Sequence, residues 1–218
     1  MARARPALAL RVSEYGKLRR RLLQVLVAYG SKRGGTAGLA AMIGGSLEAA
    51  GVTADVRLAA KVDSLDGYNA VIVGGALYAA HWHRDARRFV RQWAAELSGR
   101  PVWLFSSGPL DDSASQRDIP PVAQVRKAME LCHARDHATF GGRLAPYARG
   151  FPAAAMAKKN PRDWRDEAQV TRWVNALLPQ LTGEARLPRP NRPEAALHRP
   201  PDVSGLSSFS ASAFFRQQ

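Results

Sequence analysis

The chain has 218 residues, of which 46% are hydrophobic, and a formal net charge of +14. This length and apolar content exclude a fibrous or wholly disordered chain and are typical of one ordinary domain with some additional chain. The single cysteine, Cys132, excludes an internal disulfide, and no apolar run reaches the roughly 20 residues that a membrane span needs. We therefore expect a reduced, cytoplasmic protein whose contact with the membrane is at most peripheral, at its inner face.

The positive charge is concentrated at the N-terminal end. Residues 1–21 carry seven basic residues and one acid, whereas residues 183–218 carry five Arg and three acids together with several Pro and Ser. We predict a flexible basic extension at 1–21, a folded domain at 22–182 and a disordered tail at 183–218. A basic arm is suited to nucleic acid or to an anionic membrane, but it is more often a solvated extension, and we expect no nucleic-acid partner.

The domain opens with a strand, a loop and a helix. Residues 22–29 form a short apolar run that stops at Gly30, which is typical of a buried strand. Apolar residues then recur at helical spacing from Leu39 to Ala50, and Gly51 is a natural helix end. Residues 52–58 alternate apolar and polar side chains, which predicts a half-exposed strand near the edge of a sheet.

The alternation of strands and helices continues to residue 181. The segment from Ala70 is apolar at every position and predicts a strand covered on both faces. Later patterns predict helices at 86–97, 122–132 and 170–181 and strands at 102–105 and 137–140. Five strands alternating with helices specify a parallel sheet with helices on both faces, so the fold class is a three-layer α/β sandwich.

The first loop has the composition of an anion-binding site. It runs from Gly30 to Thr36 and leads directly into a predicted helix. Glycines let a ligand approach the backbone closely, Ser31 and Thr36 carry hydroxyl donors, and the helix dipole favours negative charge. Phosphate is therefore the expected ligand of this loop.

Other phosphate-binding and phosphoryl-transfer motifs do not match this loop. A Walker A motif requires Gly-Lys-Ser/Thr at its end, whereas Thr36 directly follows Gly35. The glycines do not spell the dinucleotide-binding pattern, and no acids mark a receiver domain. Two alternatives stay open: the loop is a simple glycine-rich turn, or Lys32 and Arg33 merely face water.

Two further strand ends carry candidate ligand-binding residues, because ligands of open parallel sheets bind beyond the carboxyl ends of the strands. Residues 74–83 combine small residues with Tyr78 and Trp82, which suits a planar ligand, although each ring considered alone is more typical of a core or an interface. His81 and His83 lack further ligands at useful spacing, so we expect no metal. The loop 106–112 is a candidate for the opposite edge of the same ligand.

The sequence contains no pattern for nucleophilic catalysis. A G-x-S-x-G elbow is absent, and Cys132 falls within a helical pattern. We name no catalytic residue.

These segments resemble the flavodoxin superfamily and, within it, the flavodoxin-domain proteins that include menaquinone-dependent protoporphyrinogen dehydrogenase. The resemblance covers roughly residues 22–182. Flavodoxins carry T/S-x-T-G-x-T after the first strand, and this chain matches at Ser31, Gly34 and Thr36 but has Arg33 in place of a hydroxyl donor. The segments GGALYAAHWH, PVWLFSSGPL and RDWRD are similar to the protoporphyrinogen-dehydrogenase branch. The short, Ala-rich residues 148–160 differ from the hydrophobic segment of its membrane-associated members.

The resemblance implies a five-stranded sheet of order 2-1-3-4-5 and FMN as the cofactor. The residues that it implies for FMN binding come from the three loops: Ser31, Lys32, Arg33, Gly34, Gly35, Thr36, Ala76, Leu77, Tyr78, His81, Trp82, Ser106, Ser107, Gly108 and Pro109. It further implies oxidation of protoporphyrinogen IX with a quinone acceptor. Two other functions stay open: a non-catalytic electron-transfer or flavin-binding module, and a DNA-associated protein that binds through its basic arm. The oligomeric state also stays open.

Overall fold

The computed structural model describes residues 20–32, 34–144 and 162–183. The predicted basic extension, except Arg20 and Arg21, lies outside these residues, as do the predicted tail beyond Gly183 and the Ala-rich segment 148–160. The domain boundaries therefore stay predictions. None of the described helices combines the length and apolarity that a membrane span requires.

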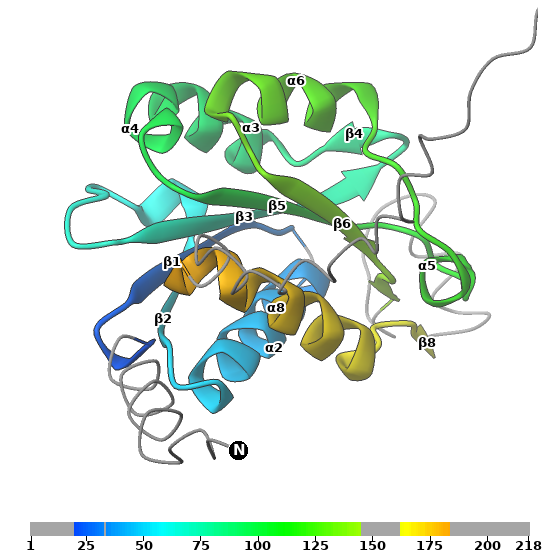
Figure 1. Ribbon diagram of the computed structural model, residues 1–218. Helices are drawn as coiled ribbons and strands as arrows, with labels where there is room; N and C mark the ends of the chain where they lie inside the picture. Colours follow the sequence, from blue (N-terminus) through cyan, green and yellow to red (C-terminus); the bar gives the residue numbers. More distant parts are fainter. Residues whose placement is uncertain (1–19, 33, 145–161, 184–218) are drawn as a thin grey trace, which may run out of the picture. The chain divides into compact units, whose positions relative to one another are not determined.

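Five parallel strands form the central sheet, in the order β2-β1-β3-β5-β6 (Figure 1). Counted along the parallel strands alone, this is the predicted order 2-1-3-4-5, and the predicted fold class is confirmed. A short strand, β4 (His81–Trp82), pairs antiparallel with the end of β3. The parallel strands are β1 (Gln24–Gly30), β2 (Thr53–Leu58), β3 (Ala70–Tyr78), β5 (Val102–Ser107) and β6 (Asp136–Phe140).

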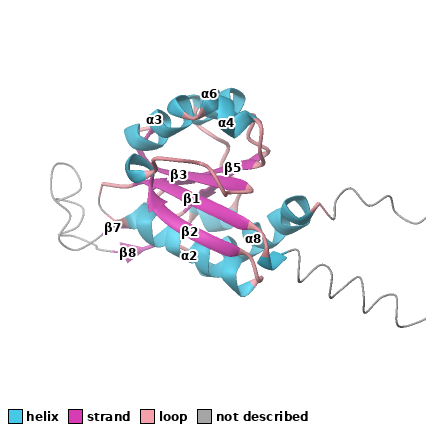
Figure 2. Ribbon diagram, turned by 90° about the vertical axis from the view of Figure 1, so that its left-hand side faces the viewer, coloured by secondary structure: helices cyan, strands magenta, loops and turns pink. Residues whose placement is uncertain are grey.

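Helices cover both faces of the sheet (Figures 1 and 2). One face carries α2 (Gly35–Ala49) and α8 (Glu167–Thr182). The other carries α3 (Arg84–Gln92), α4 (Ala94–Ser98) and α6 (Ala123–Cys132). A 3-10 turn at Ala59–Lys61 and a single helical turn, α5 (Ser113–Gln116), lie in the connections.

The two faces have separate cores because side chains alternate along each strand. Val25 and Val27 of β1 pack toward α2 and α8, whereas Leu26 and Ala28 pack toward the opposite helices. The central strands β3 and β5 are buried along their length as far as Ala76 and Ser107. A sheet covered in this way holds the carboxyl ends of its strands in fixed positions.

The structure corrects two predicted element boundaries. The first strand begins at Gln24, not Leu22, because pairing starts where the Gln24 N–H donates to Asn69 Oδ1 at 2.8 Å, and Leu22 is left 73% exposed. The helix predicted over 86–97 is two helices separated at Trp93, although the Leu97 N–H still donates to the Trp93 carbonyl at 2.9 Å.

Two strands extend into segments predicted as loops, and one pair of strands was not predicted. β3 runs to Tyr78 and β5 runs to Ser107, because each has a paired neighbour over that length. Beyond β6, β7 (Arg143–Leu144) pairs antiparallel with β8 (Arg162–Asp163). We refer to this pair, with residues 164–166 that follow it, as the β7–β8 ribbon.

Candidate functional site

The first loop joins β1 to α2 through a left-handed residue. Gly34, at φ 81°, is the N-cap of α2, and its N–H donates to Ser31 Oγ at 3.1 Å. A positive φ favours glycine, and the first N–H groups of α2 have no partner within the helix. Gly35 is the first residue of the helix. Arg33 lies outside the described residues.

Thr36 is the buried hydroxyl of this loop. The residue is 1% exposed, and its Oγ1 has no hydrogen-bond partner among the described residues. An unsatisfied buried hydroxyl costs about 1–3 kcal/mol, so such groups are expected to have a partner. Its position in the first turn of a helix, beside orphan N–H groups, fits a bound anion, and phosphate meets the donors present.

The second predicted loop is a tight hairpin. Tyr78 pairs with His81 across Ala79 and Ala80, which adopt φ angles of 47° and 61°. Positive φ at both central positions is typical of a two-residue hairpin turn, and it is strained for alanine. Tyr78 is 38% exposed at the tip, and the His81 Nδ1–H donates to the Ala79 carbonyl at 2.7 Å.

Trp82 and the glycines of β3 belong to the core. Trp82 is 1% exposed, whereas Tyr78 is 38% exposed. A Cβ on Gly74 would lie 1.9 Å from the Phe105 ring, and one on Gly75 would lie 2.5 Å from Trp82 Nε1. The expectation that these small residues admit a ligand ring is therefore wrong, since the protein's own rings fill the space. The neighbouring predicted residues, Ala76 and Leu77, are buried and half-buried in the same strand.

The third predicted loop begins two residues later than expected. Ser106 and Ser107 are buried in β5, and Ser106 Oγ shares a 2.9 Å hydrogen bond with His137 Nε2 of β6. Gly108 and Pro109 start the loop itself. The Gly108 N–H donates to the Phe140 carbonyl at 3.0 Å, which ties the loop to the end of β6.

The β7–β8 ribbon, which the sequence patterns did not predict, lies beside the first and third loops. The Gly142 N–H donates to the Pro109 carbonyl at 2.8 Å, so the ribbon begins against the third loop. A Cβ on Gly35 would lie 3.5 Å from the backbone nitrogen of Arg143, so the ribbon also lies against the start of α2. The available signal was the pair Gly141-Gly142 at a strand end, followed by an arginine.

A cavity of about 490 Å³ lies between the first two loops and the start of α3. The Asp85 N–H donates to His83 Nδ1 at 3.3 Å, and burial lowers the pKa of His83, so its imidazole is neutral at pH 7. The positive charge of the cavity therefore comes from lysine and arginine, with one acid. Its lining residues are Ser31, Lys32, Tyr78, His81, Trp82, His83, Arg84, Asp85 and Arg87.

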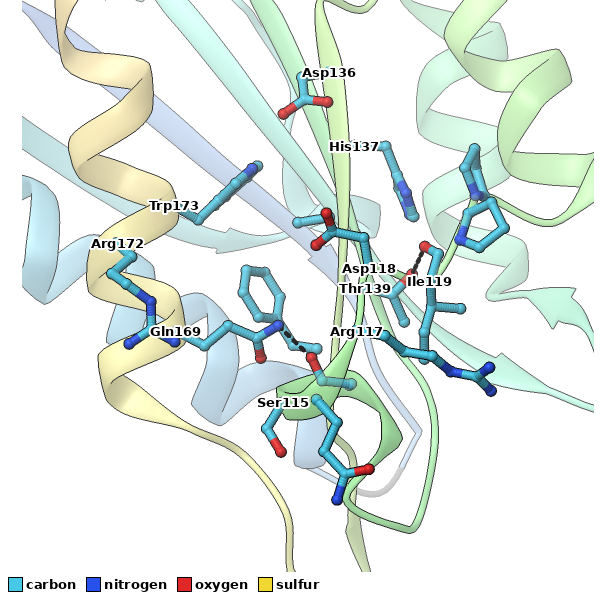
Figure 3. A pocket seen from close by; sticks show the side chains of 16 residues that line it. Ser115, Arg117, Asp118, Ile119, Asp136, His137, Thr139, Gln169, Arg172 and Trp173 are labelled. Atoms are coloured by element: carbon cyan, nitrogen blue, oxygen red, sulfur yellow. Dashed lines mark hydrogen bonds between the residues drawn. The ribbon is translucent and has the colours of Figure 1, made fainter.

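A second cavity, of about 750 Å³, lies along the outer edge of β6. The cavity is lined from both sides of this strand: Figure 3 shows Gln169, Arg172 and Trp173 of α8 on one side of β6, and His137 and Thr139 of β6 projecting to the other. Thr139 Oγ1 donates to the Ile119 carbonyl at 3.1 Å, which ties the loop after α5 to β6. Burial lowers the pKa of His137 to about 4, so this imidazole is also neutral at pH 7.

The one cysteine is not placed for chemistry. Cys132 is fully buried, its thiol donates to the Ala128 carbonyl at 3.0 Å, and burial raises its pKa to about 11. A thiol in that state is a poor nucleophile.

The comparisons agree with this geometry. A protein-family model described as flavodoxin domain matches residues 26–151, which is more than half of the chain. A cysteine-to-serine mutant of flavodoxin from Pseudomonas aeruginosa is 18% identical, with 74% of this chain and 100% of that chain covered and a TM-score of 0.50. Oxidised flavodoxin 2 from Bacillus cereus is 18% identical, with coverages of 74% and 99% and a TM-score of 0.47. Among curated proteins, none matches the chain.

The matched segment begins in β1 and contains the glycine-rich loop, Thr36 and the strand ends that surround it. The sheet order and the helices on both faces of the sheet are those expected of the same family. On the family match and the fold together, this chain belongs to the flavodoxin domain family.

Proposed function

We propose that this protein binds FMN and acts as an FMN-dependent oxidoreductase. The observation that carries the proposal is the buried Thr36 hydroxyl without a partner among the described residues, in the first turn of α2 and beside the left-handed Gly34. A ribityl phosphate is a ligand that would accept hydrogen bonds from this hydroxyl, from Ser31 and from the first N–H groups of the helix. Flavodoxins are among the proteins of similar structure.

The chain's own residues would bind and orient the cofactor. Bound FMN supplies the electron-transfer chemistry, so no side chain needs to act as a nucleophile. Tyr78, exposed at the tip of the hairpin, is suited to cover one face of the flavin ring. Gly108 and Pro109 start the loop that would lie at its other edge.

We further propose that the electron donor is an anionic, largely apolar molecule, and specifically protoporphyrinogen IX, with a quinone as acceptor. The support is the cavity beside the phosphate loop, where Lys32, Arg84 and Arg87 face a single acid, Asp85. Carboxylates such as the propionates of a tetrapyrrole are attracted by such a field. A quinone acceptor would bring the protein to the inner face of the membrane, as a peripheral partner.

The first test is an absorption spectrum of the purified full chain, followed by FMN titration. Thr36→Ala should weaken FMN binding about ten-fold or more, because it removes a hydrogen bond to a charged group. The unliganded variant should unfold no more easily than the parent, since it loses an unsatisfied buried hydroxyl. Thr171→Ala, on the exposed surface of α8, is the matched control and should bind FMN like the parent.

Equal FMN affinity of Thr36→Ala and the parent would mean that the phosphate binds elsewhere. The substrate is tested separately, by stopped-flow reduction of bound FMN with protoporphyrinogen and reoxidation by a quinone. The proposal of an anionic substrate is overturned if protoporphyrinogen reduces bound FMN no faster than a neutral donor of similar potential does and if salt does not change the rate. That result would leave the proposal of FMN binding intact.

A further inference from the structure

An arginine of the β7–β8 ribbon is buried against the first turn of α2. The Arg165 side chain is 9% exposed, and it donates from Nε to Asp163 Oδ1 at 2.8 Å and from Nη2 to Oδ2 at 2.5 Å. Its third nitrogen, Nη1, lies where a Cβ on Gly38 would come within 1.7 Å. Only a glycine at position 38 permits this approach.

A second arginine of the ribbon is close to the same helix end and is less engaged. The Arg143 backbone lies against Gly35, and its side chain is 43% exposed. Its Nε is 3.8 Å from Asp163 Oδ2, which is beyond hydrogen-bond distance. Within the described part of the chain, neither the Arg143 guanidinium nor Arg165 Nη1 has a hydrogen-bond acceptor.

The charge balance of this cluster is unfavourable without a ligand. Two guanidinium groups share one carboxylate, and one of them, through Arg165 Nη1, lies against the first turn of a helix, where cations are destabilising. The Thr36 hydroxyl, which has no partner among the described residues, lies in the same helical turn as Gly35 and Gly38. A dianion at this helix end would satisfy the hydroxyl and neutralise the excess charge.

We propose that Arg143, positioned by Asp163 and Arg165, is a phosphate-binding residue that holds the phosphomonoester dianion at the N-terminus of α2. The inference rests on the proposed function in taking the phosphate of FMN as the ligand. It adds an arginine of the ribbon to the hydroxyl and backbone N–H donors of the loop.

The experiment titrates the full chain with FMN and with riboflavin, which lacks the phosphate. Arg143→Gln should weaken FMN binding about ten-fold or more and change riboflavin binding less than about two-fold, because only FMN loses a charge-assisted contact. Arg143→Lys keeps the charge but loses the planar pair of donors, so its affinity for FMN should lie between that of the parent and that of Arg143→Gln. Arg91→Gln, on the exposed surface of α3, removes the same charge elsewhere and should bind both ligands like the parent.

A melting curve with inorganic phosphate separates this inference from the proposed function. Phosphate should raise the melting temperature of the parent and of Arg91→Gln, but not that of Arg143→Gln, and melts without phosphate verify that each variant is folded. If the parent binds neither flavin but keeps this phosphate effect, the proposed function fails and the inference stands. If Arg143→Gln binds FMN as tightly as the parent does, or weakens both flavins equally, the inference is overturned.

Discussion

The ribbon side and the cavity side of the first loop both carry basic residues, but they hold them differently. On the ribbon side Arg165 is 9% exposed and makes two hydrogen bonds to Asp163. On the cavity side Arg84 is 87% exposed and approaches Asp85 only at 3.4 Å. A buried, fixed cation acts through specific contacts, whereas an exposed one acts through a field that salt screens. We therefore expect changes on the ribbon side to alter ligand affinity and changes on the cavity side to alter encounter rate.

The same distinction applies to the neutral groups behind the site. Ser106 is buried and is hydrogen-bonded to the half-buried His137, so the pair resembles the fixed groups of the ribbon. Changes at fixed groups should therefore alter unfolding or ligand affinity, and changes at the exposed cations should alter salt-dependent rates.

The largest effect should come from pH acting on His137. Burial lowers its folded pKa to about 4, against about 6.5 when unfolded, so the unfolded state binds more protons between these values. Its contribution to stability is complete above pH 6.5 and is lost as the pH falls toward 4, by about 3 kcal/mol. Urea unfolding at a series of pH values measures this loss.

Burial also lowers the pKa of His83, so the parent must be compared with His137→Gln. The variant should have a flatter dependence of unfolding free energy on pH between 6.5 and about 4. Parallel curves for the two proteins would show that His137 does not carry the effect.

The next effect tests how tightly the ribbon is held against α2. Gly38→Ala should be less stable than Gly45→Ala by about 1–3 kcal/mol, because its Cβ would overlap Nη1 of Arg165 and displace a guanidinium that is bonded to Asp163. Gly45→Ala on the same helix is the matched control, since a Cβ there meets nothing within 4 Å. It should stabilise by about 0.5–1 kcal/mol through helix propensity. Thermal or urea unfolding of both variants measures the contrast, and equal effects would mean that the ribbon yields freely.

The smallest effect concerns the exposed cations of the cavity. Replacing Lys32 and Arg84 together by Gln should slow flavin reduction by an anionic donor about two- to five-fold at low salt, and the difference should vanish near about 1 M salt. A double variant of Arg88 and Arg91, both exposed on α3, removes the same charge outside the cavity. A loss that persists at high salt would indicate a specific contact and would remove the contrast between the two sides.

The sheet was predictable because its signals are local. The continuous apolar segment at Ala70 and the alternation at 52–58 mark a central strand and an edge strand, and β3 and β2 occupy those positions. The glycine-rich loop was found for the same reason, since Gly34, Thr36 and the helix they begin are close together in the sequence. The end of each strand was less predictable, because pairing with a neighbour extended β3 to Tyr78 and β5 to Ser107.

The sequence by itself determined the fold class, the sheet order through its family resemblance, and the loop that starts α2, because each depends on residues that are adjacent or periodically spaced. Only the tertiary structure decided that Trp82 belongs to the core, that Ser106 bonds to His137, and that Arg143 reaches Gly35. Such contacts join positions as much as 108 residues apart, and no local pattern encodes them. They arise when packing of α2 and α8 on one face of the sheet brings the strand ends and the ribbon to a common edge.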